Sequence, residues 1–585
     1  MAPKTETSLF ALLKAPGPLG EALRACRRHL LFAAGFSALV NILYLAPTLY
    51  MLQVYDRALP TSGRLTLLFV TIVLLFALIT MGALDQVRSR LLLRAGLRLE
   101  RRLAGPVLDR VLSGAGGPAR ARQAMREFDV LRQMLSGPGA LALFDAPWTP
   151  VYLIVCFILH PWVGALAVAG AVLLGGLAIL NERATRPGLL KAAEGQAAAY
   201  ATQDAAAQQS EAVRALGMRR ALTARQIKER SGAAALQADV QFVGQGYNGA
   251  IKFLRMALQS LALGLGALLA IDGQISAGAV IAASVLLSRA LQPVEQAVGA
   301  WGGIIQGRAA LHTIGELLGA AAEAPERTRL PDPKGDLTME KVVLMAPGRE
   351  QPVLKGVTFA LHPGQILGVV GPSGAGKSSL ARAAAGAVRP DSGTVRIDGA
   401  AFTDWDPERL ARHIGYAPQD PGLFAGSIKD NISRFEAHSG EAPDDLDARV
   451  VKAAQAAGAH DLILHLPQGY DTVLGPHGRG LSAGQAQRIS LARALYGDPV
   501  LVILDEPNAH LDAEGEQALT RTLAELKARG CAVLIIAHRT GVLAHADRLM
   551  VLRDGQVELL GPRDEVAARL TGGDRARPRV VSSQH

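Results

Sequence analysis

Long apolar blocks in the first half of the chain constrain its fold more than any other feature. Each block is poor in charge and close to the length that a helix needs to cross a bilayer. The second half of the 585-residue chain holds no block of comparable length. Because a chain this long exceeds a single core, we expect a membrane half followed by a soluble half. The blocks lie near residues 30–52, 66–84, 148–180, 252–271 and 277–292.

The apolar blocks predict six membrane helices. Pro161 lies between His160 and Trp162, and this tight turn with an interfacial tryptophan divides the third block into two spans. Together the helices form an all-α transmembrane domain over residues 29–315, and residues 1–28 form a segment ahead of it. The helices are expected at approximately 29–52, 65–84, 140–160, 162–182, 251–271 and 277–297.

The net charge of +10 reflects basic residues in the segments that join the blocks. Arginines are frequent between helices two and three and between helices four and five, whereas the connections 56–64, 160–162 and 272–276 hold few basic residues. Positively charged connections stay on the cytoplasmic side of a membrane, so the N-terminus and both long connections are predicted to be cytoplasmic. We favour this explanation of the charge over nucleic-acid binding.

Both long connections are rich in Ala, Arg, Gln and Glu, a composition that favours helix. We therefore expect helical hairpins that project well beyond the membrane. Residues 114–117 with Pro118 break the first hairpin near its midpoint, and residues 212–222 with Gly217 and Met218 break the second. These two turns are the candidates for contact with the soluble half.

The residue pattern changes after residue 315. Residues 316–335 are rich in Ala, Pro and charge, which predicts a linker. Between residues 336 and 570, short β-like runs alternate with helical stretches, and this alternation predicts an α/β domain with a largely parallel sheet, followed by a flexible tail over 571–585. The three cysteines are too few and too scattered for a disulfide framework or a metal cluster. The β-like runs are 366–370, 395–397, 500–504 and 532–536.

The strongest chemical motif is a glycine-rich loop that follows the run 366–370 and precedes a helical stretch. Its glycines let the backbone wrap phosphate groups, successive N–H groups point inward, and the N-terminus of the next helix adds to the attraction. We expect Lys377 to reach the β- and γ-phosphates of ATP and the Ser378 hydroxyl to bind Mg²⁺. The ATP-binding residues of this P-loop are Gly371, Pro372, Ser373, Gly374, Ala375, Gly376, Lys377, Ser378 and Ser379.

Two acids follow the run 500–504. A buried parallel strand delivers the residues at its end to the carboxyl edge of the sheet, where ligands bind. Asp505 is expected to hold Mg²⁺ through water, and Glu506 is expected to polarise the water that attacks the γ-phosphate. An Asp-Glu pair alone more often lies in a solvated turn. The prediction therefore rests on the position of this pair downstream of a P-loop.

Four further motifs resemble those of ATP-binding-cassette (ABC) proteins, and together with the P-loop they occur in the family's order. The segment 481–485 resembles the signature motif, Gln419 the Q-loop, Asp512 the D-loop and His538 the switch histidine. The resemblance covers nearly the whole chain. It implies that Glu506 and His538 are catalytic and that Gln419 contacts both ATP and Mg²⁺.

In ABC proteins two ATPase domains face each other head to tail and enclose two ATP molecules. The resemblance implies that the signature and the D-loop reach the nucleotide bound by the other chain, where hydroxyl and N–H groups stabilise the charge of phosphoryl transfer. Since one chain carries one P-loop and one signature, we expect a homodimer with ATP and Mg²⁺ as cofactors. The residues that reach the partner's ATP are Ser482, Ala483, Gly484, Gln485 and Asp512.

The sequence departs from the ABC pattern in three places. The second glycine of the signature is Ala483, which is small enough for only a modest effect. No aromatic residue occurs at 344–346, where one commonly stacks on adenine, so stacking is weaker or comes from elsewhere. Pro476 replaces an acid in a loop that exporters use for domain coupling. Because the P-loop lysine and both catalytic residues are retained, we expect active hydrolysis.

Stretches in both halves of the chain resemble the permease-ATPases of type I protein secretion, the PrtD-like group that exports proteases and RTX proteins. This resemblance implies a multi-pass protein of the bacterial inner membrane whose cytoplasmic ATPase domain drives unfolded polypeptide out of the cell. It also implies a periplasmic membrane-fusion adaptor, an outer-membrane channel and membrane lipid as partners. The stretches are 45–57, 144–148, 160–162, 405–409 and 414–419.

Two other functions fit the same architecture. A lipid or drug exporter has a wide apolar cavity open to the bilayer, and a regulatory membrane protein uses its ATPase to gate a partner without pumping. The type I stretches also have structural explanations. Asp145 and Trp148 fit the inner edge of helix three, and an acid near a membrane boundary is equally a functional candidate.

Overall fold

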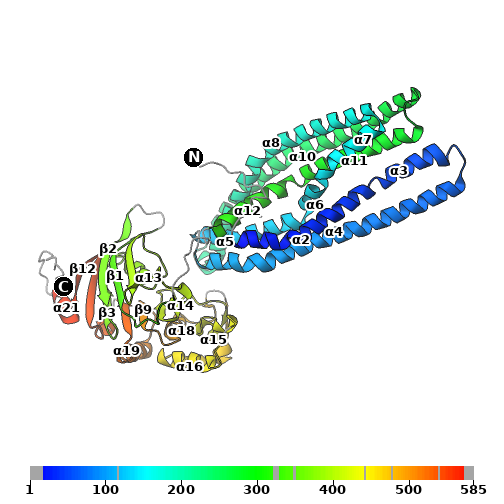
Figure 1. The fold of residues 1–585 in the computed structure, drawn as a ribbon. Coiled ribbons are helices and arrows are strands. Elements are labelled where there is room, and N and C mark those ends of the chain that lie inside the picture. The colour runs from blue at the N-terminus through cyan, green and yellow to red at the C-terminus, as the bar shows by residue number, and fades with distance from the viewer. Residues whose placement is uncertain are drawn as a thin grey trace. The chain divides into compact units, whose positions relative to one another are not determined.

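The computed structural model describes residues 17–114, 117–319, 329–346, 351–440, 443–475, 478–537 and 540–571. The chain divides into two compact units, Met1–Ala324 and Pro325–His585 (Figure 1). The division falls inside the segment expected to be a linker, although helix α12 (Trp301–Gly319) extends into the first part of that segment.

The first unit is helical, and six of its described segments are long and apolar enough to cross a membrane. This finding confirms the predicted six-helix transmembrane domain. The segments are α2 (Pro18–Leu43), α3 (Ala46–Gln53) and a π-helix (Val54–Ala58); α4 (Arg64–Leu112); α6 (Pro138–Asp145), a 3-10 turn (Ala146–Trp148) and α7 (Thr149–Leu159); α8 (Pro161–Gln208); α10 (Arg219–Ile271); and α11 (Ala277–Gly299).

Three of these helices are far longer than the apolar blocks inside them. Helices α4, α8 and α10 contain 49, 48 and 53 residues because their Ala- and Arg-rich continuations have high helix propensity. The expected helix limits at 84, 182 and 251 mark where the apolar composition stops, whereas the helices continue beyond these residues. Similarly, α2 begins at Pro18 and not at residue 29, since proline is well suited to the first turn of a helix.

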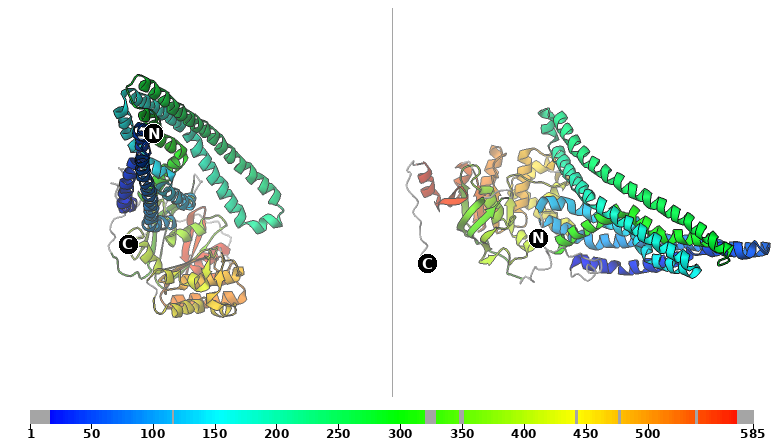
Figure 2. Two further views of the ribbon diagram at one scale, coloured as in Figure 1. Left: turned by 90° about the vertical axis from the view of Figure 1, so that its right-hand side faces the viewer. Right: turned by 90° about the horizontal axis from the view of Figure 1, so that it is seen from above.

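Both predicted hairpin turns are confirmed. Helix α4 ends before Gly114, which has a φ of 75°, and α5 (Gly117–Ser136) begins beyond that turn. The second hairpin turns through α9 (Ser210–Ala215) and Gly217, which has a φ of 66°. Figure 2 shows the distal parts of α8 and α10 running away from the other helices as a pair. No described side chain between residues 193 and 239 is buried.

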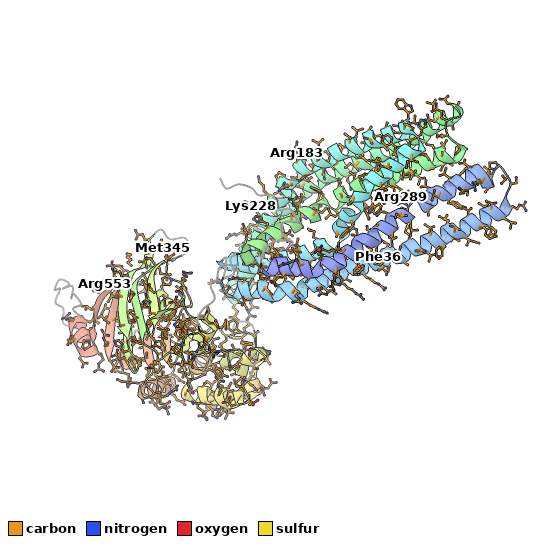
Figure 3. The ribbon with its side chains drawn as sticks, viewed as in Figure 1. Phe36, Arg183, Lys228, Arg289, Met345 and Arg553 are labelled. Carbon is orange, nitrogen blue, oxygen red and sulfur yellow. The ribbon has the colours of Figure 1, made fainter. Side chains whose placement is uncertain are left out.

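Apolar side chains of the first unit pack in three clusters, two of which share the side chain of Leu30 and are together called the Leu99 region. The Leu99 region joins α2, α4, α5, α6 and α12 through residues that include Ala33, Leu92, Leu99, Leu131, Ala140 and Ile314. The Leu258 region joins α7, α8, α10 and α11 through residues that include Cys156, Leu174, Leu258 and Leu287. Many large apolar side chains also point outward from α2 and α4, as expected of lipid-facing helices (Figure 3).

The second unit contains a six-stranded sheet in the order β12-β11-β3-β10-β9-β6. All its neighbouring strands are parallel except the edge pair β11 and β12. This sheet confirms the predicted α/β domain. Its strands are β3 (Ile366–Val370), β6 (Ile414–Ala417), β9 (Leu501–Asp505), β10 (Ala532–Ile536), β11 (Arg548–Arg553) and β12 (Gln556–Pro562).

Two smaller antiparallel sheets accompany it. The first contains β2 (Pro352–Leu361), β1 (Leu337–Met345), β4 (Ser392–Ile397) and β5 (Ala400–Ala401), and the second pairs β7 (Gly426–Ser427) with β8 (Val473–Leu474). The helices of this unit are α13 (Lys377–Ala384), α14 (Pro407–Arg412), α15 (Ile428–Ile432), α16 (Leu446–Ala456), α17 (His460–Leu464), α18 (Ala483–Leu495), α19 (Ala513–Ala528), α20 (Thr540–Leu543) and α21 (Arg563–Thr571).

All four β-like runs are strands, but one belongs to a different sheet. Strands β3, β9 and β10 are buried at nearly every residue, which is the pattern of central parallel strands covered on both faces. The run 395–397 lies in β4, where buried and partly buried residues alternate. That alternation is typical of an antiparallel sheet, and β4 pairs antiparallel with β1 and β5.

Candidate nucleotide site

The glycine-rich loop lies between β3 and α13, at the carboxyl edge of the six-stranded sheet. A Cβ atom on Gly371 would lie 2.1 Å from the carbonyl oxygen of Leu552, so only glycine fits at the start of the loop. Gly376 has a φ of 100° and caps α13, and there a Cβ would lie 2.9 Å from the carbonyl oxygen of Val353. Close backbone approach therefore fixes two of the three glycines, and the loop shape required for phosphate binding follows.

The ammonium group of Lys377 is buried inside this loop. Its Nζ atom donates hydrogen bonds to the carbonyl oxygens of Gly371 and Pro372 at 2.9 and 3.0 Å. Burial lowers the pKa of Lys377, and the charges of Glu506 and Asp505 act in the opposite direction. The cation is thus held at the centre of the loop, where it can meet phosphate oxygens.

Asp505, the last residue of β9, is 2% exposed, and its Oδ1 atom has no hydrogen-bond partner among the described residues. Burial raises the pKa of this carboxyl group, a hydrogen bond from Ser378 lowers it, Glu506 raises it, and Lys377 lowers it. A buried carboxylate oxygen without a partner, next to a hydroxyl, is a set of hard oxygen donors of the kind that Mg²⁺ prefers. Asp505 and Ser378 therefore fit the predicted metal.

Glu506 lies one residue beyond the strand in a strained backbone conformation, with a φ of 52°. Its N–H donates to the carbonyl oxygen of Ile536 at 2.9 Å, and its carbonyl oxygen accepts a bond from the side chain of Gln487 at 3.4 Å. Its carboxylate accepts a bond from the amide of Gln419 at 3.1 Å. Contacts from β10, α18 and the segment after β6 thus position this carboxylate beside the P-loop.

The signature residues form the start of α18. Ser482 caps the helix, and its hydroxyl and backbone exchange hydrogen bonds with Gln485 in a capping box. Ala483 is the first helical residue, a position where alanine favours the helix, so this departure from the family pattern is compatible with the fold. Gly484 is needed for a local reason, because a Cβ there would lie 2.9 Å from the carbonyl oxygen of His510.

Asp512 caps the next helix, α19, through the N–H of Gly515 at 2.8 Å. Its carboxylate also accepts a bond from Arg488 at 2.6 Å. The Gly515 N–H and then Arg488 lower the pKa of Asp512. Arg488 thereby joins the signature helix to the D-loop, directly beside Gln487, which joins the same helix to Glu506.

The structure brings the P-loop, Asp505, Glu506 and Gln419 together, but it does not join the signature to them. Among the described residues, no hydrogen bond or ion pair links Ser482, Ala483 or Gly484 to the P-loop. His538 and Pro476 lie outside the described residues. At the end of β1, where adenine stacking was expected to lack an aromatic residue, the side chain is Met345 (Figure 3).

Sequence reasoning missed Gln487 and Arg488 as positioning residues. The signal was present, since both directly follow the signature motif, but only the fold reveals which side of α18 faces Glu506 and Asp512. Reasoning from the sequence also missed Arg434, whose guanidinium donates to four backbone carbonyl oxygens, those of Ala411, Ile414, Arg493 and Ala494.

The chain is similar to known ATP-binding proteins of membrane transport. A family model described as ABC transporter matches residues 354–509. The type I secretion system ATP-binding protein PrsD of Rhizobium meliloti (strain 1021) is 41% identical over 570 residues, which cover 96% of each chain. The alpha-hemolysin translocation ATP-binding protein HlyB of Escherichia coli O157:H7 is 29% identical over 93% of this chain and 77% of HlyB.

A solved structure of a bacterial Atm1-family ABC exporter with ATP bound has the same fold, with a TM-score of 0.81, 24% identity, and coverage of 94% of this chain and 98% of that chain. Six apolar helical segments followed by a P-loop ATPase domain define the class: this protein is an ABC exporter, an ATPase coupled to transmembrane transport. Within that class, the chain belongs to the family of type I secretion system ATP-binding proteins.

Proposed function

We propose that this chain is the inner-membrane permease-ATPase that drives unfolded polypeptide out of the cytoplasm through a type I secretion system. One observation supports the ATPase part above all: Asp505 presents a buried, unpartnered carboxylate oxygen near Ser378, and the carboxylate of Glu506 is held directly beyond it. The names of its relatives, which translocate alpha-hemolysin and toxin RTX-I, support polypeptide as the cargo.

In this proposal the P-loop, from Gly371 to Ser379, binds the phosphates of ATP. Ser378, Asp505 and Gln419 hold Mg²⁺, which neutralises phosphate charge when it is bound. Glu506 accepts a proton from the attacking water, and His538 is the second catalytic residue. The nucleotide-binding domain extends over 336–570, and the transmembrane domain over 29–315.

We further propose a homodimer in which the signature motif and Asp512 of one chain complete the ATP site of the other. The distal parts of α8 and α10 support this proposal, because a long helical pair without a buried side chain needs a partner surface. At its tip, Leu216 and Met218 are 72% and 42% exposed. We assign the tip to contact with the second chain's ATPase domain, so that this turn couples hydrolysis to the movement of the helices.

The type I assignment brings further partners. A periplasmic membrane-fusion adaptor and an outer-membrane channel continue the path of the cargo, and lipid surrounds the apolar helices of a multi-pass protein of the bacterial inner membrane. With basic connections on the cytoplasmic side, the N-terminus and the ATPase domain are cytoplasmic.

Mass spectrometry of spent medium tests this function. Host cells carry either the wild-type protein or the Glu506→Gln variant at equal expression, and the secreted proteins of the two cultures are compared. Loss of one or a few proteins that lack a signal peptide from the variant's medium supports polypeptide export and identifies the cargo. An unchanged set of secreted proteins, with the transporter present in the membrane, rejects it in favour of lipid, drug or regulatory function.

A further inference from the structure

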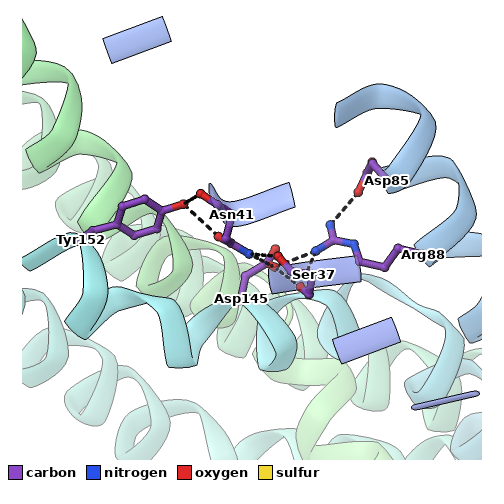
Figure 4. A network of polar contacts seen from close by, with 6 residues as sticks. All are labelled: Ser37, Asn41, Asp85, Arg88, Asp145 and Tyr152. Carbon is purple, nitrogen blue, oxygen red and sulfur yellow. Dashed lines mark hydrogen bonds and ion pairs between the residues drawn. The ribbon is translucent and has the colours of Figure 1, made fainter. Parts of the chain in front are cut away.

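A cluster of polar and charged side chains lies buried among the helices of the first unit (Figure 4). Arg88 and Asp145 are 4% and 8% exposed, which is unusual for charged residues. Because buried charges are costly among apolar helices, such a cluster is a functional candidate. Its members are Ser37 and Asn41 of α2, Asp85 and Arg88 of α4, Asp145 at the end of α6, and Tyr152 of α7.

One carboxylate oxygen holds the cluster together. Oδ1 of Asp145 accepts hydrogen bonds from Arg88 Nη1 at 2.7 Å, Ser37 Oγ at 2.7 Å and Asn41 Nδ2 at 2.9 Å. The hydroxyl of Tyr152 donates to the backbone carbonyl oxygen of Asn41 at 2.7 Å. Polar contacts therefore join three membrane segments. The third segment contributes Asp145 before its 3-10 turn and Tyr152 after it.

The cluster lies at the border of the two apolar packing regions. Along the first membrane segment, Ala33 packs in the Leu99 region, Ser37 and Asn41 follow it, and Leu45, just before α3, then packs against the Leu258 region. The third segment has the same order. Ala140, Leu141 and Phe144 pack with Ala33 and Leu92, Asp145 follows, and Leu153 and Cys156 then belong to the Leu258 region.

The helical break coincides with this border. Helix α6 ends at Asp145, a 3-10 turn containing Pro147 follows, and α7 begins at Thr149. Helix α6 contacts α2 and α5 as well as α11, whereas the main contacts of α7 are with α8 and α11. Both halves of this membrane segment thus pack on α11, and their other neighbours differ, so the break lies where part of the packing changes.

If the contact between Arg88 and Asp145 opens, each of the two residues keeps another hydrogen-bond partner. Arg88 Nη2 also pairs with Asp85 Oδ1 at 2.7 Å, and the Asp85 side chain is 49% exposed. Asp145 retains the donors Ser37 and Asn41. Removing one partner of a buried ion pair is costly because it leaves a charge uncompensated. Here Arg88 keeps an ionic partner and Asp145 keeps two neutral donors, so the Arg88–Asp145 contact can open at a smaller cost than an isolated pair.

We propose that this cluster is a polar joint, whose Arg88–Asp145 contact opens and re-forms as the two packing regions move against each other in each transport cycle. Interlocked apolar side chains resist gradual sliding, whereas hydrogen-bond partners can exchange. The joint rests on ATP-driven export as proposed above. It adds that Arg88 is a positioning residue, which acts on transport through Asp145 and touches neither nucleotide nor cargo.

The decisive variant is the double substitution Arg88→Met with Asp145→Leu, made in the full-length transporter. Replacing a buried ion pair by apolar residues of similar volume is often neutral or stabilising. If the pair serves only stability, the variant exports at the wild-type rate. If the pair is a joint, the variant has an unchanged or higher melting temperature and basal ATP hydrolysis within about twofold of wild type, but cargo export falls by about tenfold or more.

A matched control uses a part-buried ion pair that lies within one packing region. Arg255 of α10 pairs with Glu295 of α11 at 2.5 Å, and both helices pack within the Leu258 region. The double substitution Arg255→Met with Glu295→Leu removes the same charges away from the border. Export by this control is expected to stay within about threefold of wild type, since the lost interaction does not cross between the regions.

A milder variant covers the case in which the double variant fails to fold. Asp85→Asn leaves the buried pair intact and removes only the second partner of Arg88, on a half-exposed side chain. If the cluster is a joint, Asp85→Asn has a wild-type melting temperature but exports cargo about three- to tenfold more slowly. Asp85→Glu then restores the export rate. The joint is rejected if both Asp85→Asn and the double variant export cargo at the wild-type rate. If the double variant does not fold, wild-type export by Asp85→Asn alone rejects the joint.

The same assays separate this proposal from the proposed function. If the wild-type protein shows no export above that of Glu506→Gln, the proposed function fails and the joint with it. If wild-type export is normal and the joint variants match it, only the joint fails.

Discussion

The side-chain amide of Gln419 donates a hydrogen bond to the carboxylate of Glu506 at 3.1 Å. These residues follow β6 and β9, which are neighbouring parallel strands, so the contact is a direct result of the sheet order. The hydrogen bond uses the Nε2 donor of Gln419, so its Oε1 oxygen remains available as the proposed Mg²⁺ ligand while the amide orients the carboxylate of the proposed catalytic base.

Glu506→Gln is expected to retain ATP binding and to lose hydrolysis by about a hundredfold or more, because a general base contributes that much. ATP then accumulates on a closed dimer, which nucleotide-dependent crosslinking between two chains detects. Glu514→Gln, on the exposed start of α19, is the control and should hydrolyse ATP normally. Full turnover by Glu506→Gln would contradict its catalytic role.

Lys377→Ala is expected to weaken ATP binding by about ten- to a hundredfold as well as to abolish hydrolysis, since it removes a buried cation from the phosphate loop. Equilibrium binding of a fluorescent ATP analogue measures the loss. Lys452→Ala, which removes an exposed lysine of α16, should bind normally. Normal binding by Lys377→Ala would mean that its ammonium does not meet the phosphates.

Asp505→Asn is expected to raise the melting temperature of the nucleotide-free protein at neutral pH. Burial raises the pKa of Asp505, so the folded state holds its proton more tightly than the unfolded state. The stability contribution of this carboxyl is therefore present at low pH and is lost as the pH rises through the folded-state pKa. The gain of the variant should shrink as the pH falls. The extra stabilisation that Mg²⁺ adds to ATP should be lost in the same variant, and a variant that keeps the wild-type gain from Mg²⁺ would argue against the metal role.

Arg434→Met is expected to destabilise the second unit by about 3 kcal/mol, because four backbone carbonyl oxygens, three of them part-buried, lose their donor. Burial is also the main cause that lowers the pKa of Arg434 to about 10. The guanidinium ties the end of α18 to the segment around β6, as shown by bonds of 2.7 to 3.3 Å. Thermal unfolding in detergent or nanodiscs measures the loss, with Arg553→Met on the exposed end of β11 as the control. Equal melting temperatures for both variants would refute the structural role.

Leu216→Asp combined with Met218→Asp is expected to uncouple transport from hydrolysis. Both side chains are exposed in the single chain, so the charges should leave its folding intact while disrupting the proposed contact with the second chain. Basal ATP hydrolysis should persist while export falls by about tenfold or more. Leu112→Asp, at the other exposed hairpin turn, provides the comparison that shows whether one turn or both carry the coupling. Undiminished export by the double variant would remove this tip as a coupling element.

The placement of the proposed nucleotide residues was predictable because their sequence context is local. The P-loop and Glu506 each directly follow a buried strand, Asp505 ends one, and a parallel sheet brings the ends of its strands to one edge. The strain at Glu506 was not predictable, since its positive φ depends on contacts from Ile536 and Gln487 on other elements. The six membrane segments were also evident from apolar length alone.

The polar cluster of the membrane helices was not predictable. Ser37, Arg88 and Asp145 are separated by some fifty residues each, and each has an ordinary explanation in its own helix. Asp145 was considered as the edge of a span or as a functional acid, and no feature of the sequence pairs it with Arg88. Only the packing of α2 and α6 against α4 brings the three together.

Arg88 also divides α4 into two equal arms. The helix runs without interruption from Arg64 to Leu112, and each arm is about 36 Å long at 1.5 Å per residue. A rotation of about 5° around Arg88 displaces either end by roughly 3 Å, in opposite directions. For a rigid α4, a displacement of the turn after Leu112 is therefore passed to the Arg64 end of the helix at full amplitude and with its direction reversed.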